Sequence, residues 1–207
     1  EALEIEGVVP LIEALSRRVE VPISIDTSKP GVMRAAASAG AGLINDVAAL
    51  RAPQALAVAA EVGLPICLMH MQGEPRTMQR EPHYDDVVGE VIGFLQARID
   101  ACEQAGIRRQ QLLLDPGFGF GKSLAHNLTL LARLEQIAAL GLPLLVGLSR
   151  KSMLGALTGQ DVRNRTAAGV AAAMIALSRG AALIRTHDVM ATRDAISLYK
   201  AVAAIES

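Results

Sequence analysis

The chain has 207 residues, a formal net charge of −1 and 51% hydrophobic residues. This length suits one large domain that buries about 70% of the surface exposed by the unfolded chain. The near-neutral charge argues against a nucleic-acid or membrane-surface partner, and no apolar run reaches the roughly 18 residues of a membrane span.

Predicted strands and helices alternate along the whole chain. A helix over residues 1–18 comes first, and each later helical segment follows a short apolar segment; the first four of these six helices end near a glycine. The predicted strands are residues 21–26, 43–46, 64–69, 111–115, 142–148 and 182–186. The predicted helices after them run from a cap at Thr27 or Ser28 to Gly40 and over residues 53–62, 85–105, 124–140, 163–179 and 189–205.

These strand-then-helix units fit either a doubly wound sheet or a (β/α)₈ TIM barrel. A doubly wound sheet gathers ligand residues at one switch point, whereas a barrel collects them from the C-terminal ends of many strands. Polar residues follow five different strands here, namely Asp26, Asn45, Asp115, Lys151 and His187. We therefore predict an α/β fold of the TIM-barrel type, a single domain over residues 1–207 with about six of the eight units. Two strands and one helix are expected to precede residue 1.

The stretch from residue 112 to residue 122 carries the strongest single signal. Three leucines predict a strand buried on both faces, Asp115 ends it, and three alternating glycines follow. Such glycines let the backbone approach a ligand closely. The stretch does not match a phosphate-binding Walker A loop, because its glycine spacing differs from that motif by one residue. It does not match a dinucleotide-binding fingerprint either, because Lys122 occupies the position of the third glycine. A tight turn that only caps a helix stays open as the structural alternative.

The residue types narrow the ligand. Two carboxylates and an amide match a flat heterocycle with adjacent N–H donors and a carbonyl, such as a pterin or a guanine. Arg185 and His187 follow the last predicted strand, where barrels often bind phosphate. Three of the four lysines, Lys29, Lys122 and Lys151, come just after predicted strands and predict a shared positive site. A heterocycle joined to a phosphate or diphosphate would satisfy these groups.

Six motifs in chain order resemble the dihydropteroate synthase family of folate biosynthesis, which binds pterins. They are DTSKP at residues 26–30, INDV at 44–47, MHMQG at 69–73, LDPGFGFGK at 114–122, GLSRKS at 147–152 and RTHDV at 185–189. The resemblance implies a transferase that moves the dihydropterin methyl group of 6-hydroxymethyl-7,8-dihydropterin diphosphate to 4-aminobenzoate. Release of diphosphate is expected to be dissociative, without a covalent enzyme intermediate.

The resemblance also implies a role for each matching residue. Asp26, Asn45 and Asp115 would hold the pterin, and Lys151 would reach a ring carbonyl or nitrogen. Arg185 and His187 would hold the diphosphate. Ser149, Arg150 and Lys151 would lie near 4-aminobenzoate, Phe120 and Met69 would line the pocket, and Gly147 is also expected among the substrate-binding residues. The cofactor implied is Mg²⁺, with no metal ligand in this sequence because the family's asparagine ligand is expected before residue 1.

The resemblance further implies sulfonamide inhibitors that imitate 4-aminobenzoate, and a cytoplasmic homodimer. Cys67 and Cys102 have no metal-binding spacing, which favours buried free thiols in a reducing compartment. The sequence leaves two alternatives open. One is a methyltetrahydrofolate–corrinoid methyltransferase domain, which needs no residues that bind diphosphate, so Arg185 and His187 count against it. The other is a non-catalytic pterin-binding fragment.

Overall fold

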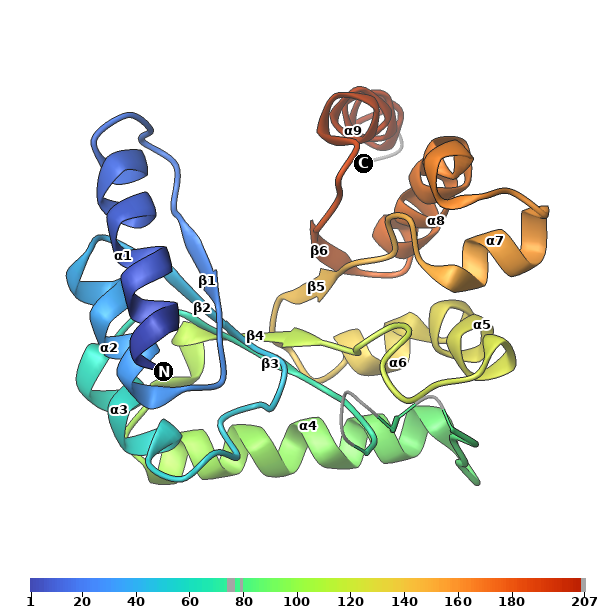
Figure 1. Cartoon of the computed structure of the whole chain (residues 1–207). Coiled ribbons are helices and arrows are strands. Elements are labelled where there is room, and N and C mark those ends of the chain that lie inside the picture. The colour runs from blue at the N-terminus through green and yellow to red at the C-terminus, as the bar shows by residue number, and fades with distance from the viewer. Residues whose placement is uncertain (74–76, 79, 206–207) are drawn as a thin grey trace. The chain divides into compact units, whose positions relative to one another are not determined.

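The computed structural model describes residues 1–73, 77–78 and 80–205 (Figure 1). The chain divides into two compact units. Unit 1 comprises residues 1–71 and 91–115, and unit 2 comprises residues 72–90 and 116–207. The single domain over residues 1–207 stays a prediction.

Unit 1 is built on four parallel strands. Its elements, together with a helix that begins in unit 2, are α1 (Ala2–Ser16), β1 (Ser24–Asp26), α2 (Pro30–Ser38), β2 (Leu43–Asp46), α3 (Ala55–Val62), β3 (Ile66–Met69), α4 (Val87–Gln104) and β4 (Leu112–Asp115). The strands pair in the order β1, β2, β3, β4. Helix α1 packs beside α2, and α2 packs beside α3 (Figure 1).

The register of these strands places the polar strand ends at one edge of the sheet. Asp26 pairs with Asn45 across β1 and β2, and Met69 pairs with Asp115 across β3 and β4. Strands β2, β3 and β4 are short and mostly buried on both faces, as in parallel sheets covered by helices, whereas β1 buries only Ile25. Ile44, Ile66, Leu68 and Leu114 are completely buried, and this core fixes the edge that carries the polar groups.

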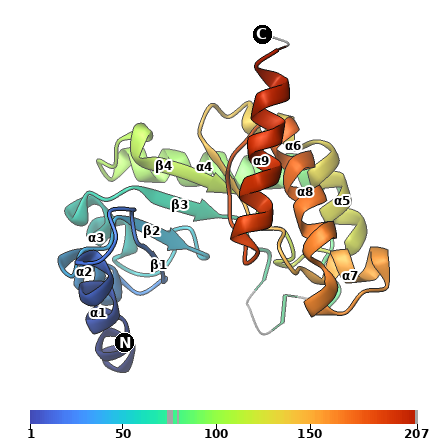
Figure 2. The same ribbon diagram turned by 90° about the horizontal axis from the view of Figure 1, so that it is seen from above.

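Unit 2 contains two parallel strands and the helices that follow them. Its elements are α5 (Leu124–Ala132), α6 (Leu134–Ala138), β5 (Leu144–Val146), α7 (Ser152–Thr158), α8 (Thr166–Ser178), β6 (Ala181–Ile184) and α9 (Val189–Ala203). Strand β5 pairs with β6, and Val146 lies opposite Ile184. Helices α8 and α9 run side by side (Figure 2). The loops after β5 and β6 therefore leave the same edge of this strand pair.

All six predicted strands are found among the described residues, most of them shorter by one to four residues. The predicted helix over residues 124–140 is wrong as one element, because it breaks at Arg133 into α5 and α6. Arg179 donates to the Ala132 carbonyl oxygen at 2.5 Å, which takes an acceptor that a continuous helix would need. Helix α7 was not predicted, and helix α8 begins three residues later than expected.

The predicted cap of α2 is also wrong. The residue at the N-cap is Lys29, whose side chain makes no capping hydrogen bond, and the Gly31 amide of the first turn donates instead to the Glu1 carboxylate at 2.6 Å. Thr27 accepts a hydrogen bond from the Lys29 amide and donates to Glu4, while Ser28 donates to Asp46. These hydroxyl groups therefore tie the loop after β1 to neighbouring elements of unit 1.

Within the part of the chain that the structure describes, no helix is both long enough and apolar enough to cross a membrane.

Candidate functional site

The first candidate group lies at the ends of β1 and β2 in unit 1. The Asn45 side-chain amide donates to the Asp26 Oδ2 atom at 3.0 Å. Asn45 is buried, whereas Asp26 is exposed. The amide thus orients an accessible carboxylate, which can accept hydrogen bonds from N–H donors of a ligand. The structure brings these two predicted residues together, and their roles toward a substrate stay predictions.

The second group lies at the ends of β3 and β4. Met69 and Asp115 are opposite each other and are at most 1% exposed. The sheet continues one step further, because the His70 amide donates to the Asp115 carbonyl oxygen at 3.0 Å. The His70 ring is buried edge-on against Phe94, with ring centroids 4.9 Å apart, as expected for a core histidine rather than a ligand.

Asp46 is a buried residue of this edge that the predicted site does not include. Its Oδ1 atom accepts from Ser28 Oγ at 2.5 Å and from the Ala48 amide at 2.7 Å. Its Oδ2 atom accepts from the Leu50 amide at 2.8 Å. An aspartate at a strand end is a known organiser of the following turn, so the signal was present in the sequence.

The turn that Asp46 organises has an unfavourable backbone conformation. Ala49 and Leu50 have φ values of 52° and 57°, which cost non-glycine residues about 1–2 kcal/mol each. Arg98 of α4 donates to the carbonyl oxygens of both residues, at 2.7 and 3.2 Å. Asp46 and Arg98 therefore hold the turn from both sides.

Replacing Asp46 by Ala is expected to lower the free energy of unfolding by about 3 kcal/mol, because two amides and a hydroxyl lose a buried acceptor. Urea denaturation would measure the loss. The matched control is Asp100→Ala, since Asp100 is exposed on α4 and accepts a hydrogen bond from the nearby Gln96 side chain. Its effect should stay within about 0.5 kcal/mol. A loss of similar size in both variants would contradict the assigned role.

In unit 2 the loops after β5 and β6 are joined through side chains. The Ser149 hydroxyl oxygen accepts from the His187 amide at 3.2 Å and lies 3.1 Å from His187 Nδ1. Arg150 forms a two-pronged ion pair with Asp188, at 2.9 and 3.4 Å. Ser149, Arg150 and His187, all predicted site residues, therefore belong to one connected group.

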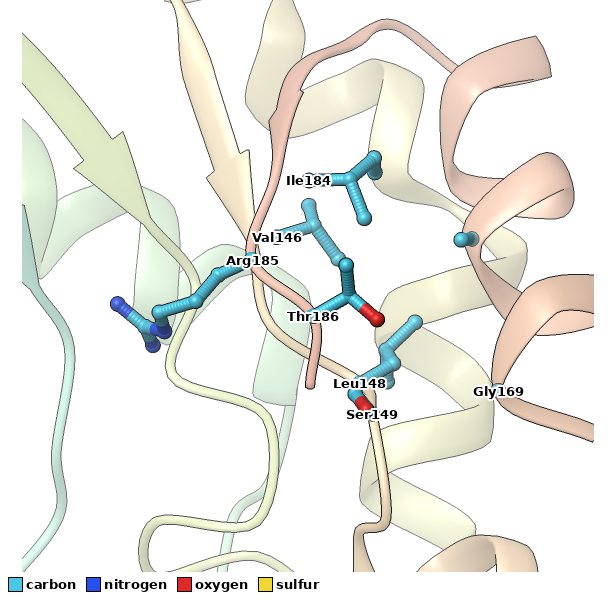
Figure 3. Close-up of a pocket in the computed structure, with 8 residues that line it drawn as sticks. Val146, Leu148, Ser149, Gly169, Ile184, Arg185 and Thr186 are labelled. Atoms are coloured by element: carbon cyan, nitrogen blue, oxygen red, sulfur yellow. The ribbon is translucent and has the colours of Figure 1, made fainter. Parts of the chain in front are cut away.

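Arg185 lies over the backbone of the loop after β5. A Cβ atom on Gly147 would lie 3.0–3.3 Å from the Arg185 guanidinium, so glycine is what allows this close approach. Figure 3 shows the Arg185 side chain pointing away from Leu148 and Ile184, although all three residues line the same small pocket. The guanidinium thus presents its fork of donors at the loop end of the strands, an arrangement suited to phosphate oxygens.

The ion pair between Arg150 and Asp188 makes stability depend on pH. Hydrogen bonds from Arg150 hold the pKa of the Asp188 carboxyl below its usual 3.8, and the same contacts raise the pKa of Arg150. Because the folded-state pKa is lowered, the stabilisation is present above the unfolded-state value and is lost as pH falls through the folded-state value.

Asp188→Asn is therefore expected to flatten the fall of Tm on acidification below about pH 4. Differential scanning calorimetry between pH 2.5 and 7 would measure the curves. Asp194→Asn, at an exposed site of α9, should give a curve parallel to that of the unchanged protein. If Asp188→Asn also gave a parallel curve, the ion pair between Arg150 and Asp188 would contribute nothing to the fall of Tm at low pH.

Phe120 and Lys151 also lie together in unit 2. The Lys151 ammonium is 4.3 Å from the centroid of the Phe120 ring, within the range of a cation–π contact. The side chain of Lys151 runs past Gly119, where an added Cβ would lie 3.3 Å from its Cδ atom. The glycine-rich loop after β4 therefore supports the lysine that the resemblance assigns to the substrates.

The prediction that three lysines share one positive site is wrong. Lys29 forms an exposed ion pair with Glu4. Lys122 is 3% exposed and donates to the carbonyl oxygens of Gly117 and Phe120. Of the three, Lys151 alone keeps its predicted place in the candidate site.

A metal site was predicted to need a ligand outside this sequence. Over residues 1–73, 77–78 and 80–205, no three His, Cys, Asp or Glu side chains are grouped closely enough to hold a metal ion. Mg²⁺ stays a prediction from the resemblance, as does the ligand expected before residue 1.

Comparisons with known proteins agree with the motifs. A family model described as pterin binding enzyme matches residues 1–187. Dihydropteroate synthase of Escherichia coli (strain K12) is 53% identical over 198 residues, which cover 96% of this chain and 70% of that protein. Dihydropteroate synthase of Haemophilus influenzae is 48% identical over 203 residues, which cover 98% of this chain and 74% of that protein.

Solved structures extend the similarity to the fold. Yersinia pestis dihydropteroate synthase in a sulfonamide drug complex superposes with a TM-score of 0.97 at 50% identity, over 99% of this chain and 75% of that chain. The Xanthomonas albilineans enzyme in complex with 7,8-dihydropteroate superposes with a TM-score of 0.91 at 52% identity, over 97% and 74%. The predicted fold class, a (β/α)₈ barrel represented by about six of its units, is confirmed. The chain belongs to the pterin binding enzymes, and among them to the dihydropteroate synthase family.

Proposed function

We propose that this protein transfers the 7,8-dihydropterin-6-ylmethyl group from its diphosphate to the amine of 4-aminobenzoate, giving dihydropteroate and diphosphate. The observation that carries the proposal is the placement of all six family motifs at or directly after the C-terminal ends of parallel strands. Relatives with about half of their residues identical are dihydropteroate synthases, and one was solved with 7,8-dihydropteroate. The same Xanthomonas albilineans enzyme was also solved with 4-aminobenzoic acid.

Unit 1 supplies the groups suited to the pterin ring. Asp26, oriented by Asn45, and the buried Asp115 can accept from the amino and ring N–H groups of a pterin. Met69 lies next to Asp115 and offers a polarisable apolar surface to the ring. Two carboxylates also favour a substrate that becomes positively charged during the reaction.

Unit 2 supplies the groups suited to the leaving group. The Arg185 guanidinium can bind two phosphate oxygens at once, and His187 adds a donor when it is protonated. Ser149 holds His187 by accepting its backbone amide and contacting its ring nitrogen. These fixed donors stabilise the negative charge that develops on the departing diphosphate, without reorganisation during the step.

The proposed reaction breaks the bond between the pterin methylene carbon and the diphosphate oxygen. The bonding electron pair leaves with the diphosphate, and the methylene group becomes cation-like. The amine nitrogen of 4-aminobenzoate then forms the new C–N bond and loses a proton. Since no protein nucleophile is required, alignment of the two substrates supplies much of the rate.

Mg²⁺ is a proposed cofactor of this reaction. It is usually held by one or two carboxylates together with substrate phosphates and water, so the diphosphate would supply much of its coordination. We further propose a cytoplasmic homodimer, in line with the family resemblance. Cys67 and Cys102 are buried and neither forms a disulfide bond among the described residues, and burial raises the pKa of the Cys102 thiol to about 11, which fits unreactive thiols in a reducing compartment.

A two-substrate assay tests the proposed function. The enzyme is incubated with dihydropterin diphosphate and radiolabelled 4-aminobenzoate, and labelled dihydropteroate is separated by chromatography. Product is expected with the diphosphate, and not with 6-hydroxymethyl-dihydropterin, which lacks the leaving group. A sulfonamide should compete with 4-aminobenzoate. Failure to form product with both substrates present would refute the proposal.

A further inference from the structure

The glycine-rich loop after β4, residues 117–121, has a backbone conformation that needs contacts from other residues to stay ordered. Gly117, Gly119 and Gly121 have φ values of 70°, 79° and 61°. Glycine adopts this conformation without steric cost, but it also has the largest conformational freedom of any residue. A loop with three such positions would lose much entropy on becoming ordered, so contacts that hold it in place matter more than usual.

One buried ammonium group joins the two ends of this loop. Lys122 is 3% exposed, and its Nζ atom donates to the carbonyl oxygens of Gly117 and Phe120, both at 3.0 Å. The Phe120 amide also donates to the Gly117 carbonyl oxygen at 3.1 Å, which closes the turn. Hydrogen bonds from a charged donor are about twice as strong as neutral ones, so Lys122 fixes the turn firmly.

A second buried side chain fixes the middle of the loop. Asn127 of α5 is 3% exposed, and its Oδ1 atom accepts from the Gly119 amide at 2.7 Å. Its Nδ2 atom donates to the carbonyl oxygens of Lys122 and Ser123, at 3.3 and 2.7 Å. One side chain thus connects the loop to the first turn of the following helix.

The last glycine of the loop is held from a separate segment of unit 2. Tyr84 donates its hydroxyl to the Gly121 carbonyl oxygen at 2.9 Å. A Cβ atom on Gly121 would collide with the carbonyl oxygen of Gln72, so only glycine fits there. Lys122, Asn127 and Tyr84 together form what we call the loop clamp.

The loop clamp sets the position of two residues assigned to the substrates. Phe120 lies within the turn that Lys122 closes, and its ring contacts the Lys151 ammonium at 4.3 Å. Gly119, which Asn127 holds, borders the aliphatic part of Lys151. A shift of the loop would therefore move the ring and release the lysine at the same time.

We infer that Lys122 is a positioning residue for the 4-aminobenzoate end of the site, acting through Phe120 and Lys151 without contacting substrate. This inference rests on the proposed function and on the family resemblance, which implies that Lys151 lies near 4-aminobenzoate and that Phe120 lines the pocket. If Lys122 were only structural, its replacement would lower stability and would weaken the binding of both substrates to the same extent.

Kinetics of Lys122→Met test the inference, since methionine keeps the length of the side chain and removes its donors. The value of kcat/KM for 4-aminobenzoate is expected to fall by about 100-fold, chiefly through KM, as for a displacement of about 1 Å. Calorimetry should show a smaller loss of affinity for dihydropterin diphosphate, at most about tenfold, because Asp26, Asn45 and Asp115 still hold the pterin when Lys151 is displaced. Lys200→Met, at an exposed lysine of α9, is the matched control and should change neither value.

A reporter in the loop separates positioning from stability. The chain contains no Trp, so Phe120→Trp introduces a single fluorophore at the tip of the loop. Adding Lys122→Met is expected to raise acrylamide quenching of this fluorophore by about threefold and to lower its anisotropy, because the turn opens. Asn127→Leu, which removes the bond to Gly119, should act in the same direction if Lys122→Met fails to fold.

Each outcome has a defined meaning. If the unchanged enzyme forms no dihydropteroate, the proposed function fails, while the quenching measurement still tests the loop clamp. If Lys122→Met and Asn127→Leu lower Tm but leave the KM for 4-aminobenzoate and the quenching unchanged, the positioning role is overturned. Equal losses of affinity for both substrates would also overturn it.

Discussion

Asp115→Asn is expected to lower kcat/KM for dihydropterin diphosphate by about 1,000-fold, since a site built to hydrogen-bond a substrate discriminates strongly when one partner is wrong. The buried carboxylate only accepts hydrogen bonds, whereas an amide would turn an N–H donor toward the N–H donors of the pterin. The variant also removes negative charge that favours the cation-like methylene group. Initial rates at varied pterin diphosphate would measure the effect.

Two features make this variant interpretable. Asparagine has nearly the size of aspartate, and the hydrogen bond from the His70 amide goes to the backbone oxygen of Asp115, so the pairing of β3 and β4 is retained. Asp100→Asn, on the exposed face of α4, serves as the control and should leave the rate unchanged. Unaltered affinity for pterin diphosphate in calorimetry would remove Asp115 from the pterin site.

Arg185→Ala is expected to weaken binding of dihydropterin diphosphate by about 300-fold, because losing a charged donor pair to phosphate costs a few kcal/mol. The effect should depend on the phosphate groups. Binding of 6-hydroxymethyl-dihydropterin, which lacks them, should stay within about threefold. Calorimetric titration with both ligands would show the difference.

The control for this variant is Arg193→Ala, since Arg193 is an exposed arginine on α9. Its affinity for both ligands should equal that of the unchanged enzyme. Because Arg185 lies over Gly147, a thermal scan of Arg185→Ala is needed to show that the loop after β5 remains folded. An equal loss of affinity for the phosphate-free pterin would argue that Arg185 supports the site without binding diphosphate.

The strands could be predicted from sequence because their signal is local. Runs such as residues 43–46 and 112–115 are apolar, buried on both faces and ended by a polar residue, and the structure places each as expected. The break at Arg133 could not be predicted, because the Arg179 guanidinium that takes the Ala132 carbonyl oxygen is 47 residues away in sequence. Such a contact leaves no mark on local periodicity.

The candidate site shows the same division. Asp26, Asn45 and Asp115 were predicted as site residues because they are polar residues at the ends of predicted strands. The structure joins two of them, since the Asn45 amide donates a hydrogen bond to Asp26. The partners of Lys122 and Asn127 are backbone groups of a loop, and their geometry exists only once the loop is folded. Position after a strand therefore suggested an anion-binding lysine at residue 122, where the folded loop shows a structural donor.

The central claim is that residues of unit 1 bind the pterin and residues of unit 2 bind the leaving diphosphate. Titrating one variant of each unit with each of two ligands tests this claim most directly. Asp115→Asn and Arg185→Ala are each titrated in a calorimeter with 6-hydroxymethyl-dihydropterin and, separately, with inorganic diphosphate. We expect Asp115→Asn to lose the pterin and keep diphosphate, and Arg185→Ala to show the reverse. Loss of both ligands in both variants, or of neither, would contradict the assignment of the pterin to unit 1 and of the leaving group to unit 2.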